Sequence, residues 1–302
     1  MRIALLSVNR RLYSTRRLWE ACRKGGHDVR FLHPRRCAVA WLEDGAVMTQ
    51  GGLKIEGMDV VLPRVGTSVT ETGLVVLRHL EGLGVRTPNT AESIGRSRDK
   101  VASLQWLSHC GVPVPPSVFV DVPDQIEECA ALLGGPPVVV KVVRGTQGVG
   151  VIKVGELDQL RATVEALWGL GEQVLVQRFV SEAQGRDLRL FVVGDEVAAA
   201  MERESAPGDF RSNLHRGGTA RGFRPDQETA ALAVKAAKAL GLGIAGVDLL
   251  ITQEGPVVLE VNSSPGLEGI EAATGKNLAR VIVKHLESLM TRAKPEVAKE
   301  FQ

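Results

Sequence analysis

The chain has 302 residues, of which 44% are hydrophobic and 24% charged. This length suggests two domains, or one long α/β domain with subdivisions. Lys and Arg number 37 against 35 Asp and Glu, so the formal net charge is only +2. A dedicated nucleic-acid-binding protein normally carries a strongly basic surface, and we therefore expect no direct nucleic-acid partner.

The cysteines and the apolar segments predict a cytoplasmic protein that makes no contact with a membrane. Cys22, Cys37, Cys110 and Cys129 form no CxxC pair and no zinc-type cluster with histidine, which favours buried, reduced thiols. The apolar start of the chain is too short for the core of a signal peptide. The uncharged segment at residues 103–120 contains three prolines and is therefore no membrane-spanning helix.

The first third of the chain predicts the opening of a parallel α/β sheet. An apolar strand at 2–8 leads to a helix that ends at the glycine pair 25–26, and a second strand follows at 28–32. This order predicts a βαβ unit. No GxGxxG sequence follows the first strand, which argues against a dinucleotide site there. A further strand is expected at 59–63 and a helix at 68–83.

The composition changes at residues 87–89, and a helix is predicted to begin at Asp99 and Lys100. Gly111 and the prolines after it end this helix and force an extended connection. From Pro136 onward the sequence is rich in strand-like runs. Further helices are expected at 157–167, 228–240 and 277–290, and a charged, frayed tail at 294–302.

A glycine-rich sequence, GTQGVG at 145–150, lies between two β-branched runs. The Lys-Ser or Lys-Thr pair of a Walker A motif is missing after Gly150, and the flanking residues predict a strand–loop–strand hairpin. Glycines let backbone N–H groups approach phosphates closely. Lys141 shares a strand face with Val139 and Val143, so it either contacts an anion or reaches water from an edge strand. The neighbouring glycine-rich loop favours a phosphate contact.

A second hairpin brings two carboxylates together. Apolar runs at 246–252 and 256–262 flank a predicted three-residue loop that ends in glycine. In that register Asp248 lies opposite Glu260, and Asn262 points to the same face. Facing carboxylates repel each other unless something neutralises them, and this oxygen-only set suits Mg²⁺ or Mn²⁺. The alternative is a solvated acidic face, but no Lys or Arg lies within the hairpin, so we predict metal binding.

Residues 209–218 have neither helical nor strand periodicity and predict a loop. Arg211, His215 and Arg216 are suited to clamping anions, with Asn213 as a neutral partner. The alternative is a solvated surface loop. Its place in the sequence, between the glycine-rich hairpin and the carboxylate hairpin, favours a binding site.

Taken in order, these sequences resemble the hallmarks of ATP-grasp ligases. They are Lys100 with GVPVP at 111–115, Lys141 with the glycine-rich loop, Asp248, and EVNSSPGLEGI at 260–270. The sequences LPRVGT at 62–67, EAQG at 182–185 and GDFRSNLHRGG at 208–218 resemble the RimK-type α-L-glutamate ligases in particular. The resemblance extends from Met1 to about Met290.

The resemblance implies an α/β fold with an N-terminal, Rossmann-like pre-ATP-grasp domain at 1–95. An α+β ATP-grasp fold of two lobes would follow, with a central lobe at 96–176, a C-terminal lobe at 177–290 and a charged tail at 291–302. The resemblance also implies a homo-oligomer, namely a tetramer.

Each candidate residue receives a role from the resemblance. Lys100 and Lys141 would contact ATP phosphates, Arg178 and Phe179 would hold the adenine through backbone groups, and Asp187 would bind the ribose. Arg211, Ser212 and Asn213 would line the nucleotide site, and Asp248, Glu260 and Asn262 would carry two ions of Mg²⁺ or Mn²⁺. Lys141, Arg203 and Arg211 would be catalytic. Because guanidinium groups bind carboxylates bidentately, Arg189, Arg203 and Arg216 are also candidates for holding the acidic substrates, together with His215. The chain departs from the family at Arg178, where a Glu is usual.

By the same resemblance the protein would be an ATP-dependent ligase that activates a carboxylate as an acyl phosphate for attack by L-glutamate. The acceptor would be an acidic peptide, namely the C-terminus of a small-subunit ribosomal protein, or else glutamate and poly-glutamate. One alternative is a sister ligase acting on a coenzyme, a pterin or a carrier protein. Another is a non-catalytic nucleotide-binding regulator, which would have lost metal ligands that this chain retains.

Overall fold

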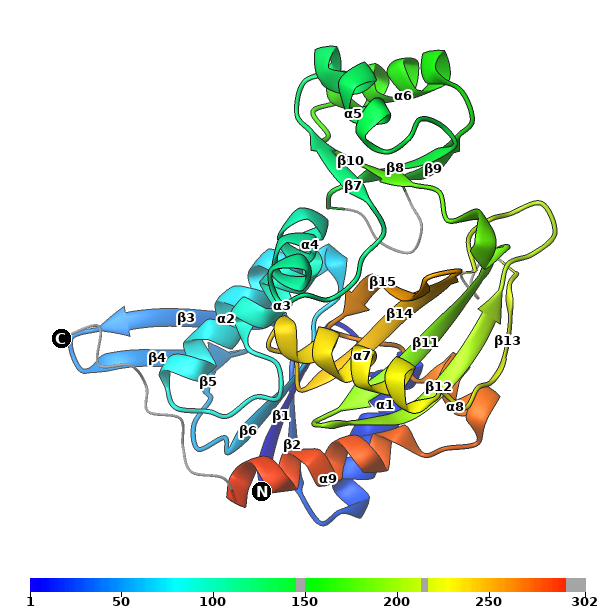
Figure 1. The fold of residues 1–302 in the computed structure, drawn as a ribbon. Helices are drawn as coiled ribbons and strands as arrows, with labels where there is room; N and C mark the ends of the chain where they lie inside the picture. Colours follow the sequence, from blue (N-terminus) through cyan, green and yellow to red (C-terminus); the bar gives the residue numbers. More distant parts are fainter. Residues whose placement is uncertain (145–149, 213–216, 292–302) are drawn as a thin grey trace.

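The computed structural model describes residues 1–144, 150–212 and 217–291. Across these ranges the strands form four sheets. The amino-terminal sheet is parallel, with the order β2-β1-β6, and helices α1 and α2 pack on it (Figure 1). The strands are β1 (Arg2–Ser7), β2 (Asp28–Leu32) and β6 (Val60–Arg64), and the helices are α1 (Tyr13–Lys24) and α2 (Thr70–Gly82).

These five elements lie within a few residues of the predicted ones. Helix α1 ends next to the predicted glycine pair, because Gly26 adopts a φ of 76°, a left-handed conformation that terminates helices at little cost only in glycine. The βαβ prediction for the amino-terminal segment is therefore confirmed.

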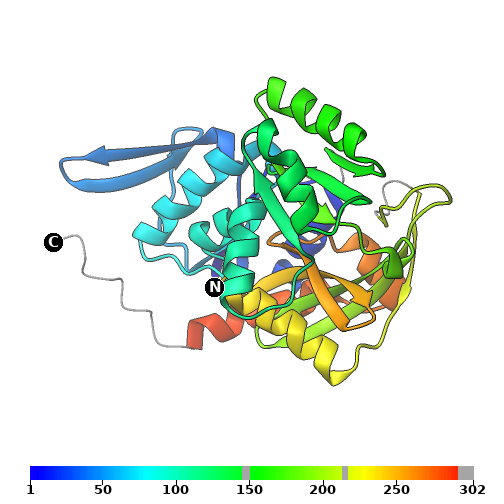
Figure 2. The ribbon, with the colours of Figure 1, turned by 45° about the horizontal axis from the view of Figure 1, so that its top comes forward.

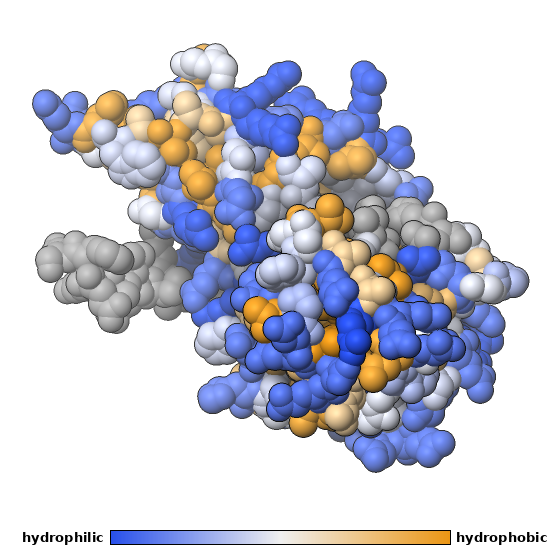
Figure 3. Space-filling model, turned by 90° about the horizontal axis from the view of Figure 1, so that it is seen from above, coloured by the Kyte–Doolittle hydropathy of each residue, from blue (hydrophilic) through white to orange (hydrophobic). Residues whose placement is uncertain are grey.

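An antiparallel hairpin that the sequence pattern does not predict projects from this sheet between β2 and β6 (Figure 1). Its strands carry small and apolar residues without the alternation expected of a half-buried strand. Hydrophobic side chains lie along the projection behind a hydrophilic tip (Figure 3). We call this segment the arm; it contains β3 (Cys37–Leu42), β4 (Gly45–Gln50) and β5 (Leu53–Lys54).

Two helices, α3 (Ala91–Arg98) and α4 (Lys100–His109), meet at a sharp junction. The carboxylate of Asp99 caps α4 by accepting hydrogen bonds from two backbone N–H groups of its first turn. Helix α4 therefore begins at Lys100, as predicted, whereas α3 was not predicted. The junction places Arg98 and Lys100 on either side of one capping residue.

The small lobe is an antiparallel sheet of order β7-β10-β8-β9 with two helices packed on it. Its pairing of β8 with β9 confirms the predicted strand–loop–strand hairpin, although residues 145–149 of the loop lie outside the described ranges. The elements are β7 (Ser117–Val120), α5 (Ile126–Leu132), β8 (Val138–Val142), β9 (Val151–Val154), α6 (Leu157–Gly169) and β10 (Val174–Arg178).

The large sheet is antiparallel, with the order β13-β12-β11-β14-β15. Helix α7 covers one face, and α8 and α9 pack against β11, β12 and β13 from the other (Figure 1). The elements are β11 (Arg186–Val193), β12 (Glu196–Glu204), β13 (Thr219–Gly222), α7 (Gln227–Ala239), β14 (Ile244–Thr252), β15 (Gly255–Asn262), α8 (Glu268–Thr274) and α9 (Leu278–Thr291).

The hydrophobic cores show which parts are packed together. One core joins Leu5 and Leu18 of the amino-terminal segment to Phe191 of the large sheet and Ile282 of α9. The small lobe has a core of its own and stands over β14 and β15 (Figures 1 and 2). A space between the small lobe and the rest of the molecule can therefore change shape without opening either core.

Two further expectations concern membranes and thiols. Within the described residues, no helix is long and apolar enough to cross a bilayer. Cys22 and Cys129 are buried and free, and burial raises the pKa of Cys22 to about 12. The expectation of buried thiols is wrong for Cys110, which is exposed because it follows the last residue of α4 on the surface.

Candidate active site

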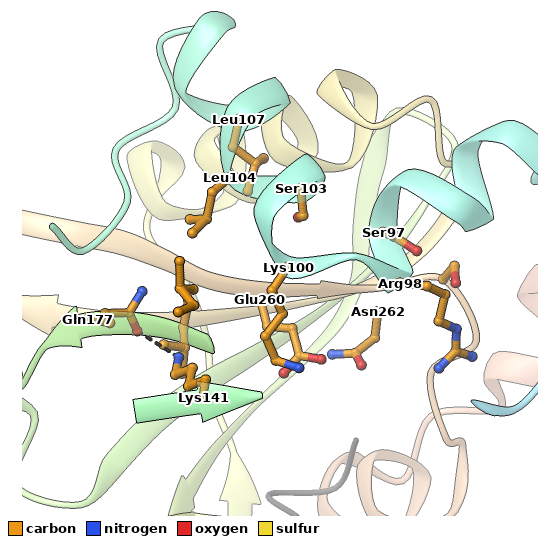
Figure 4. A pocket seen from close by; sticks show the side chains of 13 residues that line it. Ser97, Arg98, Lys100, Ser103, Leu104, Leu107, Lys141, Gln177, Glu260 and Asn262 are labelled. Carbon is orange, nitrogen blue, oxygen red and sulfur yellow. Dashed lines mark hydrogen bonds between the residues drawn. The ribbon is translucent and has the colours of Figure 1, made fainter. Parts of the chain in front are cut away.

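A pocket lies where the small lobe faces the ends of β15 and the junction of α3 with α4 (Figure 4). The small lobe contributes Lys141 and Gln177, the large sheet contributes Glu260 and Asn262, and the helices contribute Lys100. Four of the predicted site residues thus meet in one pocket although they come from three separate structural units.

Lys141 is a buried cation in the middle of β8. Its side chain is 9% exposed, and its Nζ donates a 2.6 Å hydrogen bond to the neutral Oε1 of Gln177 on β10. Burial is the main cause that lowers the pKa of Lys141 to about 8. A buried ammonium group without a carboxylate ligand has a high affinity for an anion. The edge-strand alternative does not apply, because β8 lies between β9 and β10.

The low pKa of Lys141 predicts how stability depends on pH. Because the unfolded lysine keeps its proton up to about pH 10.5 and the folded one loses it near 8, the unfolded state binds more protons between these values. The free energy of unfolding should therefore rise with pH across this window, by on the order of 3 kcal/mol. Urea unfolding without nucleotide at pH 7.5 and 10 measures this, and Lys141→Met is the control that should lack the increment. Equal pH slopes in both proteins would contradict the prediction.

Lys100 links the helices to the strand that enters the glycine-rich loop. Its Nζ donates hydrogen bonds to the backbone carbonyls of Val142 at 3.0 Å and Val143 at 3.3 Å. Burial lowers the pKa of Lys100. Lys100 therefore lies in the same pocket as Lys141, where the two ammonium groups would favour a polyanion (Figure 4).

The carboxylate hairpin has the predicted pairing, with one correction. Asp248 lies opposite Glu260, and Gly246 opposite Asn262. The loop is shorter than predicted, however, because Thr252 pairs with Gly255 and leaves two residues between them. A β-bulge next to Asp248 adds one residue to β15 and so restores the predicted register at the carboxylates.

Asp248 and Asp187 belong to an ion-pair network across three strands. Arg189 donates to both carboxylate oxygens of Asp248, at 2.7 and 2.6 Å. Arg203 donates to both oxygens of Asp187, each at 2.6 Å, and its Nη2 also lies 3.0 Å from Asp248. Burial alone would raise the pKa of Asp248, but the guanidinium groups of Arg189 and Arg203 outweigh it and hold the pKa below its usual value. The network is charge-balanced within itself.

This network bears on roles that the resemblance assigned. Asp187, expected at the ribose, also accepts a 2.5 Å hydrogen bond from Ser212, and it faces Arg203 directly in the strand register. Arg189, expected to hold substrate, faces Asp248 directly. In the structure these guanidinium groups bind carboxylates of the chain itself, which leaves their roles towards substrate and phosphate as predictions.

The donor set nevertheless fits a nucleotide with a divalent cation. Glu260 is exposed to the pocket between Lys100 and Asn262 (Figure 4). Asn262 Nδ2 lies 3.5 Å from Asp248 Oδ2, which leaves the amide oxygen for another partner. No group of three His, Cys, Asp or Glu side chains with metal-site geometry occurs in the described part of the chain. Glu260 and Asn262 thus offer a carboxylate and an amide oxygen, which suit a cation that phosphates also coordinate. Both oxygens of Asp248 are bound by Arg189 and Arg203 in this structure, so its predicted role as a metal ligand stays a prediction.

The other nucleotide candidates lie at the end of β10. The side chain of Arg178 is exposed and its backbone N–H donates to the carbonyl of Pro116, so the departure from the family places no side chain in the pocket. The Nζ of Lys153 lies over the ring of Phe179, 3.8 Å from the ring centroid, in a cation–π contact. Arg211 pairs with Asp209 at 2.9 Å. The remaining candidates, Asn213, His215 and Arg216, lie outside the described residues.

Sequence reasoning missed Arg64 and Arg98, which approach the pocket from the amino-terminal sheet and from α3. Arg98 lines the pocket beside Asn262 (Figure 4). A signal for Arg64 was present, because it ends an apolar strand and lies within the sequence LPRVGT at 62–67 that resembles the RimK-type enzymes. Arg98 lies in a helix that was not predicted, and no local pattern indicates it.

Comparison with known families agrees with this fold and pocket. The model of the RimK PreATP-grasp domain matches residues 1–94, and that of the RimK-like ATP-grasp domain matches residues 97–286. The fold is therefore that of an ATP-grasp ligase, an enzyme class that uses ATP and a divalent cation. The chain belongs to the RimK-like ATP-grasp family, as its sequence indicated.

Curated relatives and solved structures extend the comparison. A protein named probable alpha-L-glutamate ligase from Xanthomonas axonopodis pv. citri (strain 306) is 51% identical over 293 residues, or 97% of this chain and 99% of the relative. A relative of the same name from Stenotrophomonas maltophilia (strain K279a) is 50% identical over 96% of this chain and 99% of its own length. The RimK domain protein ATP-grasp from Sphaerobacter thermophilus DSM 20745 shares the fold at a TM-score of 0.71 and 24% identity, covering 95% of this chain and 100% of that one. The ATP-grasp ligase PsnB complexed with minimal precursor shares it at 0.76 and 23%, over 95% and 98%.

Proposed function

We propose that this enzyme joins L-glutamate, through an α-peptide bond, to the C-terminal carboxylate of an acidic acceptor. The acceptor is a small-subunit ribosomal protein, or glutamate and poly-glutamate. The names of the relatives support the amino acid. The observation that carries the reaction class is that a buried Lys141, whose hydrogen bond goes to the neutral Gln177, shares one pocket with Glu260 and Asn262.

The proposed chemistry has two steps. An acceptor carboxylate oxygen attacks the γ-phosphorus of ATP, forming a C–O–P bond while the bond to ADP breaks. The amine of L-glutamate then attacks the acyl carbon, phosphate leaves, and the nitrogen loses a proton. A divalent cation would neutralise phosphate charge. Lys100 and Lys141 would bind the phosphate oxygens, and Glu260 and Asn262 would position the reacting groups, since such transfers depend on positioning and electrostatics.

The test is ADP release by the purified protein with Mg²⁺-ATP and each of twenty amino acids, with and without an acidic peptide. Release that depends on L-glutamate, together with a mass ladder on the acceptor, supports the proposal. Release with another amino acid moves the chain to a sister ligase that acts on a coenzyme, a pterin or a carrier protein. ATP binding without turnover under every condition, including added ribosomal protein, favours a non-catalytic regulator.

We also propose that a second copy of this chain binds the arm, as the resemblance to oligomeric enzymes implies. Strand β3 is an edge strand that contains no charged residue, and Trp41 near its tip is 75% exposed. Natural edge strands usually carry charges that prevent such pairing. Antiparallel pairing of two β3 strands about a two-fold axis between Val39 and Ala40 would bring Arg36 to Glu43 of the partner subunit, so the charges are self-complementary.

Replacing Trp41 by Glu should therefore prevent association through the arm, so that the protein sediments as a smaller oligomer or as a monomer. Two carboxylates buried near a two-fold contact repel each other and lose hydration. Sedimentation velocity at several protein concentrations measures the change. Trp168→Glu, at a 53% exposed position on α6, is the control and should leave the mass unchanged. A monomeric wild-type protein, or an unchanged Trp41→Glu oligomer, would contradict this interface.

A further inference from the structure

Two arginines beside the active-site pocket form no ion pair with a carboxylate of the described residues, although the charge of Glu260 acts on one of them, Arg98. Arg64 ends β6 and donates from Nη2 to the backbone carbonyl of Pro265 at 2.7 Å. Arg98 ends α3 and donates from Nη2 to the carbonyl of Val65 at 2.5 Å. Neither guanidinium forms an ion pair with a carboxylate in the described part of the chain. Both are thus bonded to neutral carbonyl groups alone, in contrast to Arg189 and Arg203.

The two guanidinium groups are close enough to repel each other. Burial lowers the pKa of Arg64 to about 10, and the charge of Arg98 adds to this effect. Burial also lowers the pKa of Arg98, and the negative charge of Glu260 partly offsets this. Like charges in a buried environment are costly unless an anion lies between or beside them. An anion bound beside Arg64 and Arg98 would therefore reduce their mutual repulsion.

Several buried polar groups near Arg98 have no hydrogen-bond partner among the described residues. The Nε of Arg98 and the hydroxyls of Ser263 and Ser264 are buried and have no hydrogen-bond partner within the described ranges. Ser263 is only 3% exposed, and it lines the pocket together with Arg98. Buried polar atoms in folded proteins are almost always satisfied, so several orphans together indicate a missing partner. All of these groups are able to donate, and an acceptor with more than one oxygen would satisfy them.

The position of this cluster in the pocket indicates which ligand group it binds. Lys141 lies on one side of the pocket, Lys100, Glu260 and Asn262 lie in the middle, and Arg98 lies beyond Asn262 on the other side (Figure 4). The phosphates of the nucleotide belong with the two lysines. A substrate whose carboxylate receives the phosphoryl group must place that carboxylate in the middle, and the group attached to it then lies on the arginine side.

We propose that Arg64, Arg98 and Ser263 bind the side-chain carboxylate of the acceptor's terminal acidic residue, while its α-carboxylate reacts. This rests on the proposed ligase function, since it names the acceptor subsite of that reaction. Guanidinium groups bind carboxylates through paired, charge-assisted hydrogen bonds, and a serine hydroxyl adds one more. The site accordingly selects an acidic last residue, because an amide or an alkyl group would leave two buried cations without an anion.

The test uses two peptides that differ only at the last residue, which is Glu in one and Gln in the other. The wild-type enzyme should prefer the Glu peptide by roughly 10- to 100-fold in kcat/KM. Arg98→Met and Arg64→Met should each lose most of this preference, through a higher KM for the Glu peptide, with little change for the Gln peptide or in the KM for ATP. Ser263→Ala should reduce the preference by a smaller factor. Arg96→Met is the matched control, because Arg96 lies on the same helix but binds Glu92 and stacks on Trp106.

Direct binding separates this proposal from the proposed reaction. Calorimetry with each peptide measures affinity whether or not turnover occurs, and circular dichroism establishes that each variant is folded. If the wild-type protein binds the Glu peptide more tightly and Arg98→Met does not, the subsite stands even without ligase activity. Equal loss with both peptides, a raised KM for ATP, or unchanged discrimination in both arginine variants would overturn the proposal.

Discussion

Replacing Glu260 by Gln is expected to lower the rate of ADP release by about 10³-fold or more. Glu260 lies in the pocket with its carboxylate exposed, and no ion pair with it occurs among the described residues. The change would therefore remove one charged oxygen ligand of a divalent cation without breaking an ion pair within the described residues. It also removes the negative charge that raises the pKa values of Arg98, Lys100 and Lys141. Because Gln has nearly the same shape as Glu, the fold should remain intact. ADP release at saturating Mg²⁺ and Mn²⁺ binding followed by electron paramagnetic resonance measure the two consequences.

The same hairpin offers a control and a companion variant. Glu254→Gln changes an exposed residue in the turn and should leave both measurements unchanged. Asp248→Asn should also abolish ADP release, but it disturbs Arg189 and Arg203 and will cost stability as well. Full turnover of Glu260→Gln at saturating Mg²⁺ would refute the assignment of this residue as a metal ligand.

Replacing Arg203 by Met should destabilise the protein by about 3–5 kcal/mol. Arg203 is 3% exposed and neutralises Asp187, whose remaining described side-chain partner is the neutral Ser212. Without the guanidinium, a buried carboxylate must either remain unpaired or take up a proton. Urea unfolding at pH 7.5 measures the loss, and ADP release in the same protein tests the predicted catalytic role of Arg203.

A double-mutant cycle shows whether the pair itself is responsible. Removing the charge from Asp187 in the Arg203→Met background, by Asp187→Asn, should recover part of the loss, because the two residues are in direct contact. Arg221→Met is the control, since its pair with Glu202 is exposed and should contribute no more than about 1 kcal/mol. Strictly additive effects of the two buried substitutions would show that the ion pair does not carry the stability.

Much of the site was visible in the sequence because it depends on local rules. Strand alternation placed Asp248, Glu260 and Asn262 on one face, and the observed register agrees. A charged residue in an apolar strand singled out Lys141, which proves to be buried. The hairpin loop was predicted one residue too long, since the position of a β-bulge depends on the neighbouring strand rather than on the loop residues.

The roles of the arginines required the tertiary structure. Arg189 and Arg203 look like substrate ligands in a linear sequence, yet β11 lies between β12 and β14 and places each of them directly opposite an aspartate. Arg64 and Arg98 come from a strand and a helix that meet only in the folded chain. The charges near an arginine decide whether it pairs with a carboxylate of the protein or binds a ligand. Most of those charges come from residues far away in the sequence.

The sequence by itself determined the family, the strand and helix order around the pocket, and the residue types needed for phosphate and metal chemistry. These follow from periodicity, turn residues and ordered motifs, which act over a few residues. Only the tertiary structure decided that Lys141 forms no ion pair with a carboxylate of the described residues and that Arg203 forms two such pairs. It also decided that Arg98 reaches the backbone next to Arg64. Sheet order and packing set these distances, and electrostatic energy depends on distance and burial rather than on position along the chain.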